Sequence, residues 1–492
     1  MEIIPAVGEA EKLGTQLLVL GIFCDAPLTG SAWAVNQRSA GGLAAMLDKD
    51  GLGEAVGETW PVGSLPGVAA QRLLLVGLGR AGNFSEGAYR RALAAVAVAL
   101  NDDPANEVVV TLAENEVPRR TLSWRMRQAG RLLADGRYDF GLPDRRMRED
   151  KRSIMLLVPQ TLTSELVGAL RQGVAIGEGV SFAKELGDLP PDLCTPAFIA
   201  RTVETMASQF GFSVEVLGRR EFEKHDMAAF LAGEKVATGA CKLIVMRSMH
   251  RMATGRPIVL VGDGVAALEA LPEHEQRVHR APIRDMRGIG SVLGAMRTVE
   301  RLGLALNVVG LIVASQGGPS QVAGGSTGGA PEPSLLGDVL SYAAHFSPSC
   351  VIDVAALTRA CAVALGSQAS GLFANDEALA SELMKCGGTS GDRVWQLPLW
   401  DDDLPCAFVR GGIDQTAGSP PDAVAAASSL ARFATAYPWA HLDISGTAST
   451  ADPLRSSTGR PVPLLAEFLI GRARSTRRRP AFSPRPRTEL HS

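Results

Sequence analysis

Short apolar runs alternate with helix-like segments along almost the whole chain, and this alternation restricts the fold more than any other feature. LLVLGIF (Leu17–Phe23), RLLLVGLG (Arg72–Gly79) and EVVVTLA (Glu107–Ala113) have the length of strands. Tyr89–Asn101 is rich in Ala and other good helix formers. Ser153–Pro159 predicts a further strand. Strands that alternate with helices predict a parallel or mixed sheet with helices on its faces.

The alternation resumes after a proline-rich break and predicts a second α/β unit. Glu165–Leu186 predicts a long helix, which DLPPDLCTP (Asp188–Pro196) ends. The strands expected beyond it are Phe212–Gly218, Lys242–Ser248, Pro257–Gly264, Asn307–Ser315, Cys350–Thr358 and Trp439–Ala448. The helices expected there are Ala197–Phe210, Gly288–Leu302 and Leu335–His345.

The length of 492 residues exceeds one ordinary hydrophobic core, so we expect two domains. The prediction is a smaller N-terminal α/β domain (residues 1–155), a connecting helix with the Pro-rich segment (156–195), and a larger C-terminal α/β domain (196–473). The central sheet of the larger domain is expected to be mostly parallel.

Composition favours a soluble, cytoplasmic protein. Apolar residues make up 46% of the chain and charged residues 21%, and the net charge of −3 indicates no class of partner. The seven cysteines contain no CxxC pair, which fits reduced thiols. The first residues, MEIIPAVGEAEKLG, carry charges where a signal peptide needs an apolar core. No apolar run reaches the roughly 18–20 residues of a membrane span, so no membrane association is expected.

The C-terminal tail has a different composition. Arg472–Ser492 contains seven arginines, three prolines and one acid. Its proline content and lack of apolar periodicity predict disorder over residues 474–492. Arg477, Arg478, Arg479, Arg485 and Arg487 suit nucleic-acid phosphates, although a solvated extension is the favoured interpretation.

Several other motifs are interpreted as structural. GLGRAG (Gly77–Gly82) lacks the G-x-G-x-x-G spacing of a dinucleotide site and is expected to be a strand that ends in a glycine turn. The segment GGPSQVAGGSTGGAP lacks the pattern of a phosphate-binding loop. No G-x-S-x-G nucleophile motif occurs, and His441 in WAHLDIS is expected to be a core histidine.

Six stretches, in order, carry a family resemblance over roughly residues 170–473. They are LGDLPPDLCTP, DMAAFLAGEKVATGACKLIVMRS, VIDVAALTRACAVALGSQASGLFAND, GDRVWQLPLWDD, WAHLDISGTA and TGRPVPLLAEFLIGRA. Together they resemble the leucine (cytosol) aminopeptidase family of the bacterial aminopeptidase A type. RLLLVGLGRAG extends the resemblance weakly into the first domain.

The resemblance implies a two-metal peptidase fold. Members of this family remove the N-terminal residue of a peptide with two zinc or manganese ions, which polarise the scissile carbonyl and activate a bridging water. Their ligands lie in a G-K-G-x-x-F-D-S-G-G loop, a Y-D-M segment and an N-T-D-A-E-G-R loop. The family assembles as hexamers, so a hexamer is also implied here.

This chain departs from the first of those loops, which reads VGDGVAALEALPEHEQ (Val261–Gln276). Asp263 stands where the resemblance places a metal-binding lysine, and Leu268 where it places a bridging aspartate. The S-G-G turn is replaced by Glu269–Leu271, and the catalytic lysine falls near Glu275. Asp285, in IRDMRG, remains as the family's aspartate.

The third loop is missing. The chain is about 16 residues shorter than the family between Val313 and Leu340, and Gly329, Pro331 and Pro333 stand at the aspartate, glutamate and arginine positions. We therefore expect no catalytic residues, no bound cofactor and only Asp285 as a vestigial metal ligand. The chain is interpreted as a family member that has lost peptidase activity and serves as a structural, assembly or binding subunit.

Three alternatives stay open. Glu273, His274, Glu275, His279 and Asp285 form a cluster that is a possible replacement metal site for a residual or altered peptidase. Its H-E-x-x-x-H spacing is not the helical H-E-x-x-H pattern, so a solvated loop is favoured. The hexamer is either homomeric or mixed with an active paralogue. A DNA-binding or regulatory hexamer that uses the basic tail is the remaining possibility.

Overall fold

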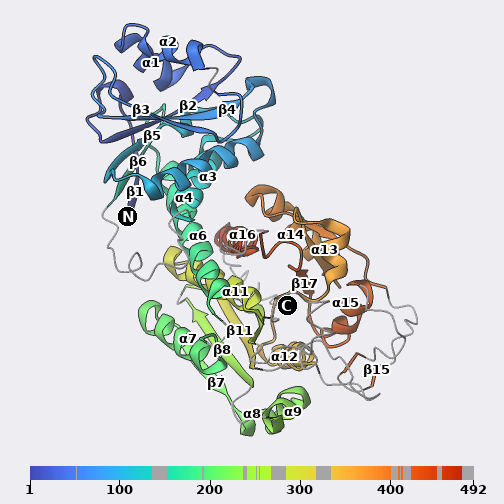
Figure 1. Ribbon diagram of the computed structural model, residues 1–492. Coiled ribbons are helices and arrows are strands. Elements are labelled where there is room, and N and C mark those ends of the chain that lie inside the picture. The colour runs from blue at the N-terminus through green and yellow to red at the C-terminus, as the bar shows by residue number, and fades with distance from the viewer. Residues whose placement is uncertain are drawn as a thin grey trace, which may run out of the picture.

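The computed structural model describes residues 1–50, 53–135, 152–190, 193–236, 241–250, 252–253, 255–266, 284–316, 334–400, 408–409, 412–413, 423–450 and 457–478. Two large sheets organise these residues, one in each half of the chain (Figure 1), and β15 (Phe408–Val409) pairs with β16 (Gly412–Ile413) in a separate two-stranded sheet. The predicted class, a two-domain α/β fold, is confirmed.

Six strands form the first sheet, in the order β1-β6-β5-β2-β4-β3. Their bounds are β1 Glu2–Ala6, β2 Leu17–Phe23, β3 Thr59–Val62, β4 Leu73–Gly79, β5 Glu107–Val110 and β6 Ser153–Leu157. All neighbours are parallel except β3, which pairs antiparallel with β4 at the edge. β5 is shorter than the predicted strand because Leu112–Glu114 form a 3-10 helix.

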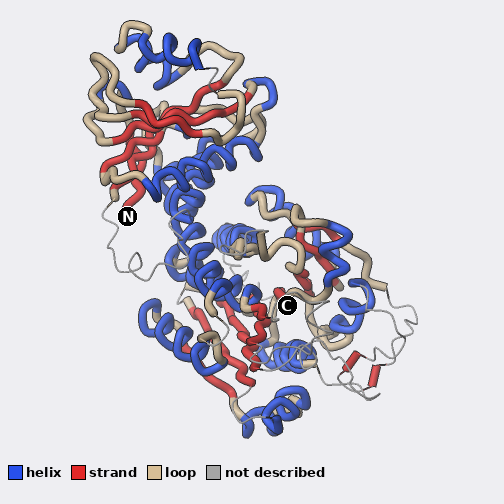
Figure 2. The backbone as a smooth tube through the Cα atoms, in the orientation of Figure 1, coloured by secondary structure: helices blue, strands red, loops and turns tan. Residues whose placement is uncertain are grey.

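Helices cover both faces of this sheet, as the tube drawing shows (Figure 2). On one face lie α1 (Gly30–Arg38) and α2 (Gly42–Asp50), which pack on Leu18 and Leu20 of β2. On the other lie α3 (Glu86–Asp102), α4 (Leu122–Asp135) and the start of α6. The odd residues of β2 face this second layer. Because strand side chains alternate, the continuous apolar run of β2 is buried on both faces.

The long helix α6 (Ser164–Asp188) runs from the first domain into the second (Figure 1). Thr163 caps its N-terminus by accepting the backbone N–H of Leu166. Side chains of α4 reach the second domain directly. Arg127 binds both carboxylate oxygens of Glu467 at 2.8 and 2.6 Å, and both side chains are largely buried. The two domains are therefore joined by a helix and by a buried ion pair.

The second sheet has the order β14-β13-β17-β12-β9-β11-β8-β7. Its strands are β7 Ser213–Leu217, β8 Cys241–Met249, β9 Ile258–Ala266, β11 Asn307–Gln316, β12 Cys350–Ala355, β13 Ser370–Ala374, β14 Val394–Gln396 and β17 Trp439–Asp443. The central strands β17, β12, β9 and β11 are mutually parallel. The pairs β13–β17, β11–β8 and β8–β7 are antiparallel. The sheet is mixed, with a parallel centre, in agreement with the prediction.

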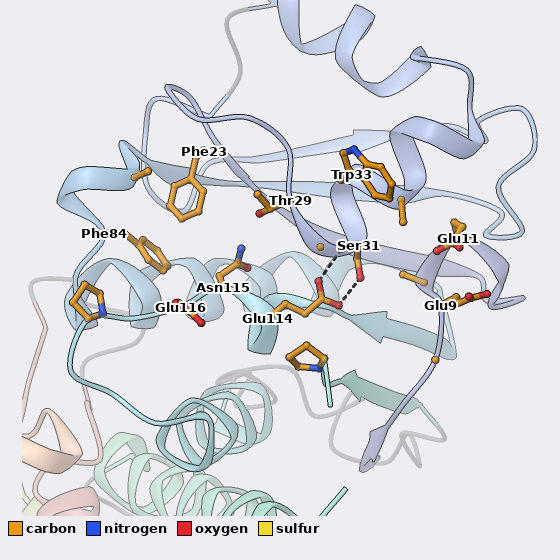
Figure 3. A pocket seen from close by; sticks show the side chains of 17 residues that line it. Glu9, Glu11, Phe23, Thr29, Ser31, Trp33, Phe84, Glu114, Asn115 and Glu116 are labelled. Atoms are coloured by element: carbon orange, nitrogen blue, oxygen red, sulfur yellow. Dashed lines mark hydrogen bonds between the residues drawn. The ribbon is translucent and has the colours of Figure 1, made fainter. Parts of the chain in front are cut away.

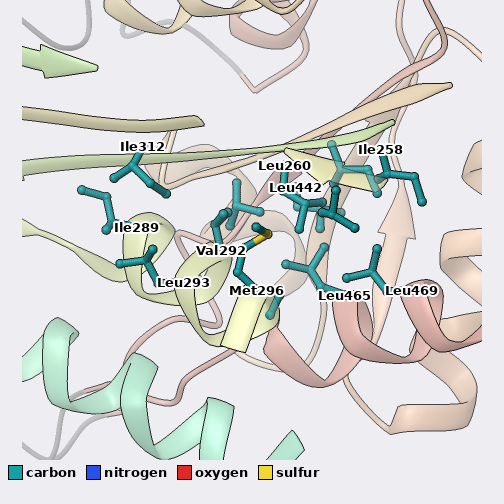
Figure 4. Packing of buried hydrophobic residues seen from close by; sticks show 14 of the residues in the cluster. Ile258, Leu260, Ile289, Val292, Leu293, Met296, Ile312, Leu442, Leu465 and Leu469 are labelled. Carbon is teal, nitrogen blue, oxygen red and sulfur yellow. The ribbon is translucent and has the colours of Figure 1, made fainter. Parts of the chain in front are cut away.

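Helices of the second domain divide between the two faces of this sheet. One face carries α7 Pro196–Phe210, α11 Arg287–Leu302, α14 Glu377–Ser390 and α16 Val462–Arg478. The other carries α8 Arg219–Lys224, α9 Ala228–Val236, α12 Leu335–Ala343 and α15 Ala423–Ala431. Figure 4 shows the first face, where Ile258, Leu260, Ile289 and Leu465 belong to one buried cluster. A short helix, α13 (Arg359–Leu365), follows β12.

The last described helix extends beyond the predicted boundary of the tail. α16 ends at Arg478, whereas disorder was expected from residue 474. Arg472 binds Glu382 of α14 at 2.9 and 2.6 Å, and this pair holds the last part of the helix against α14. Residues 479–492 lie outside the described residues. None of the described helices combines the length and the apolar character that a bilayer crossing requires.

Candidate functional site

Two of the positions singled out by the family resemblance, Asp263 and Asp285, lie near the carboxyl end of the central strand β9. Asp263 is half-buried near the end of β9. Arg284–Asp285 form the short strand β10, which pairs antiparallel with β9 so that Asp285 lies opposite Val265. Crevices at the carboxyl edge of parallel strands are the usual ligand sites of α/β folds. The backbone thus brings Asp285 to the same edge of the sheet as Asp263.

A close helix–strand contact holds this edge in place. A Cβ atom on Gly288, in the first turn of α11, would lie 2.4 Å from the carbonyl oxygen of Val354 and 2.5 Å from that of Asp263. A Cβ on Gly262 would lie 2.8 Å from the carbonyl oxygen of Gly288. No side chain fits at either position. The two glycines therefore let α11 start directly against the ends of β9 and β12.

A buried Asp–His pair lies on the neighbouring strands β12 and β17. Asp353 and His441 are register partners, and Asp353 Oδ1 is 2.5 Å from His441 Nδ1. Trp439 Nε1 donates to Asp353 Oδ2 at 2.6 Å. Burial alone lowers the pKa of His441, but the carboxylates of Asp353, Asp443 and Asp263 outweigh it and raise the pKa. The predicted core position of His441 is confirmed. Its contact with Asp353 was not predicted from the sequence.

The carboxylate of Asp443, at the end of β17, accepts hydrogen bonds from nearby residues. One of its oxygens accepts the backbone N–H of Thr358, and the other accepts the N–H and hydroxyl of Ser445. The carboxylates of Asp353 and Asp443 thus already have internal donors. These two buried acids organise the strand ends, and sequence reasoning missed them. Their signal was an acidic residue inside an otherwise apolar strand, in VIDVA and HLDI.

Only two of the implied metal-ligand positions, Asp263 and Asp285, fall within the described residues. Within the part of the chain that the structure describes, no three His, Cys, Asp or Glu side chains gather closely enough to hold one ion. Of the metal-ligand positions implied by the resemblance, Asp285 and Asp263 carry a carboxylate. Leu268, Gly329, Pro331 and Pro333 lie outside the described residues, and none of these residue types has a side-chain donor.

Other predicted features can be placed only in part. Glu269–Leu271, Glu273, His274, Glu275 and His279 fall outside the described residues, as does the glycine-rich insert. Gly77 and Gly79 end β4 as expected. A Cβ on Gly77 would lie 2.3 Å from the carbonyl oxygen of Ala55, which gives this glycine a packing role.

Four of the described cysteines are poor candidates for a nucleophile. Burial raises the pKa of Cys241 to about 12, that of Cys350 to about 11 and that of Cys386 to about 12. Burial also raises the pKa of Cys361. A thiol acts as a nucleophile through its thiolate, which these raised values disfavour. Six cysteines are described, and all are free thiols.

Comparison with solved structures identifies the same architecture elsewhere. A mutant of tomato leucine aminopeptidase superposes with a TM-score of 0.79 at 21% identity, covering 96% of each chain. The bottromycin maturation enzyme BotP superposes with a TM-score of 0.75 at 23% identity, covering 94% of this chain and all of that one. Likeness at these identities shows the shared fold.

Comparison of amino-acid sequences is more specific than comparison of folds, because it identifies the family. A protein of Azoarcus sp. (strain BH72) called probable cytosol aminopeptidase is 42% identical, covering 96% of this chain and 99% of its own. One of the same name from Methylobacillus flagellatus is 37% identical, covering 95% and 98%. The model of the cytosol aminopeptidase N-terminal domain matches residues 19–142, and that of the catalytic domain matches 181–325 and 334–466. The chain therefore belongs to the cytosol aminopeptidase family.

Proposed function

We propose that this chain is a cytosol aminopeptidase family member that does not carry out two-metal peptide hydrolysis and instead acts as a binding or assembly subunit. The observation that carries the proposal is the set of residue types that the sequence has at the family's ligand positions. Leu268, Gly329 and Pro331 stand where the resemblance calls for carboxylates. The match to the catalytic-domain model is also interrupted at residues 326–333, within the replaced third loop.

Charge balance supports this proposal. Two dications a few ångströms apart repel each other strongly and need several carboxylates to offset that repulsion. Asp263 and Asp285 together supply two negative charges. The lysine and arginine side chains that would stabilise developing charge in the reaction are also replaced. Asp263, Glu275 and Pro333 stand at those positions. Removing one such group commonly costs a factor of about 10² or more in rate.

The rest of the fold does not depend on those residues. The largest buried cluster packs α11, α16 and α7 on the sheet through aliphatic side chains such as Val292, Met296 and Leu469. Burial of apolar surface stabilises the chain without any metal ion. A folded domain with a remodelled active-site edge is the expected result, and a folded surface is what binding or assembly needs.

The test is an aminopeptidase assay on the full chain with leucyl-p-nitroanilide and added manganese or zinc. An Asp285→Ala variant purified in parallel is the matched control, because a contaminating host peptidase contributes equally to both preparations. We expect equal, background rates from both and no stoichiometric metal by elemental analysis. Metal-dependent turnover by the wild type that the Asp285→Ala variant lacks would overturn the proposal.

The assembly part of the proposal has its own test. The family resemblance favours a hexamer, either of this chain alone or mixed with an active paralogue. Light scattering on the purified chain measures whether it forms a hexamer by itself. Affinity purification from the native host tests whether an active paralogue is part of the assembly. A monomer that captures no paralogue contradicts both versions. The relatives' name, cytosol aminopeptidase, supports a cytoplasmic location for this chain.

A second candidate function is nucleic-acid binding by the basic tail. α16 continues to Arg478, so arginines at the end of this helix adjoin those that follow it. A gel-shift experiment should compare the full chain with one ending at Arg478, because ending at Arg472 would truncate α16. Loss of a low-salt DNA shift on removal of residues 479–492 would support this function. No shift with the full chain would reject it.

A further inference from the structure

A cavity of about 800 Å³ opens in the N-terminal domain (Figure 3). Its walls come from segments that follow different strands, including Gly8–Glu11 after β1, Thr29–Ser31 after β2 and Glu114–Glu116 after β5. The volume lies within the range of about 300–1,000 Å³ that small-molecule sites occupy. Neither the active-site resemblance nor the proposed function makes use of this cavity.

The position of the cavity in the sheet is that of a ligand site. β2 and β5 are parallel neighbours, but the chain leaves them in opposite directions. After β2 it passes to β3 and β4 on one side, and after β5 it passes to β6 on the other. The loops at the carboxyl ends of two such strands diverge and leave a crevice between them. The residues of both loops line this cavity.

Aromatic side chains supply the apolar part of the lining. The rings of Phe23 and Phe84 meet edge to face, with centroids 5.0 Å apart. Trp33 of α1 keeps 54% of its surface exposed, an unusual state for so large an apolar side chain. In Figure 3 the two phenylalanines lie at one end, and Trp33 lies toward Glu9 and Glu11.

The carboxylate of Glu114 binds the N-terminus of α1. One oxygen of Glu114 accepts the backbone N–H of Ser31 at 2.8 Å, and the other accepts its hydroxyl at 2.5 Å. Gly30 makes this contact possible, since a Cβ at that position would lie 2.5 Å from the Glu114 carboxylate. One N–H donor that the helix N-terminus would offer to a phosphate or carboxylate is therefore already bound to a carboxylate.

The remaining polar lining is acidic. Glu9, Glu11, Glu114 and Glu116 line the cavity, and the described lining residues include no Lys, Arg or His. Glu9 forms an ion pair with Lys12 just outside. Glu11 differs, because its Oε2 atom is buried and has no hydrogen-bond partner among the described residues. A buried carboxylate oxygen without a donor is costly unless a ligand supplies one.

We propose that this cavity binds a small organic cation, a primary ammonium group carried on an aromatic or other apolar body. The ammonium donates to Glu11 and lies near the face of Trp33, where a cation–π contact is available. The apolar body extends toward Phe23 and Phe84. An anion of the same shape is excluded by the four carboxylates.

The test is calorimetric titration of the full chain with 2-phenylethylammonium, with 3-phenylpropionate and 2-phenylethanol as the anionic and neutral counterparts. Binding of the amine, and neither counterpart at the same concentration, is expected. Glu11→Gln keeps the shape of the side chain and removes its charge, and should weaken amine binding by about 10-fold or more. Glu107→Gln, an exposed acid of the same domain, is the matched control and should bind as the wild type does.

A second variant keeps the proposal testable if Glu11→Gln fails to fold. Trp33→Ala truncates an exposed side chain, so the fold is retained, and amine binding should weaken by about 2- to 5-fold. Absence of amine binding at millimolar concentration would overturn the proposal. So would equal binding of the anion, or equal weakening by Glu11→Gln and Glu107→Gln.

Discussion

Asp353 and His441 face each other across two neighbouring parallel strands, with Asp353 Oδ1 2.5 Å from His441 Nδ1 and both side chains fully buried. Trp439 donates to the second oxygen of the same carboxylate. Burial lowers the pKa of His441, and the neighbouring carboxylates, Asp353 first, raise it above its ordinary value, which favours the imidazolium form. Removing one member of a buried pair leaves the other without compensation, which costs more than the pair contributes.

Asp353→Asn should therefore destabilise the second domain severely. The amide keeps an acceptor for Trp439 but removes the charge that balances His441. We expect the free energy of unfolding to fall by about 3–5 kcal/mol. Urea denaturation followed by circular dichroism measures the change, and Glu54→Gln, an exposed acid, is the control. A loss below about 1 kcal/mol would show that His441 is neutral in the folded chain.

The partly buried carboxyl group of Asp338 should make the free energy of unfolding depend on pH. Burial raises its pKa to about 6, although its carboxylate accepts the N–H groups of Ala229 and Phe230. The folded state therefore keeps the proton to a higher pH than the unfolded state does, and this contribution to stability falls as the pH rises from about 4 to 6. The resulting cost at neutral pH is about 2–3 kcal/mol, at 1.36 kcal/mol for each pKa unit.

Asp338→Asn should remove that cost. The variant and the wild type should have similar unfolding free energies near pH 4, and the variant should become the more stable one by pH 7. Urea titrations at several pH values in this interval measure the difference. Equal stability of the two proteins at both ends of the interval would contradict a raised pKa at Asp338.

Because α11 packs closely on the sheet, we expect a side chain larger than that of glycine not to fit at Gly288. Gly288→Ala would place a Cβ within 2.5 Å of two backbone carbonyl oxygens, which have no freedom to move away. We expect a loss of about 3 kcal/mol or more, or a failure to fold. Gly168→Ala in α6 is the matched control, because nothing lies within 4 Å of its Cβ position. That change should be stabilising by about 0.5–1 kcal/mol, and thermal unfolding of both variants checks the contrast.

Regular elements with simple patterns could be predicted closely from the sequence. β2 matches its predicted bounds, Leu17–Phe23, because a fully buried parallel strand is apolar at every position. α7 was equally clear, since Thr195 caps it, Pro196 opens it and Gly211 ends it with a φ of +83°. Elements with mixed patterns were missed. α4 buries Arg125 and Gln128, which interrupt its apolar face.

The sites were less accessible to sequence reasoning, because they depend on residues far apart in the chain. Asp353 and His441 are separated by 88 positions, and only the register of β12 and β17 brings them together. The cavity in the first domain likewise joins Glu11, Trp33 and Glu114 from three separate segments. The departures at Asp263 and Leu268 were visible only against the family resemblance.

On the proposed function, metal dependence should separate this chain from family members that keep the complete motifs. A ligand present at 100 times its dissociation constant stabilises the folded state by about 2.7 kcal/mol. For domains of this size, that corresponds to a rise in melting temperature of about 5 °C or more. Under the proposed loss of the two-metal site, we expect millimolar manganese or a chelator to shift the melting temperature of this chain by less than about 1 °C. A family member with an intact G-K-G-x-x-F-D-S-G-G loop, scanned alongside, should show the larger rise. A comparable rise in this chain that Asp285→Ala abolishes would mean that a metal site has been rebuilt at this edge of the sheet.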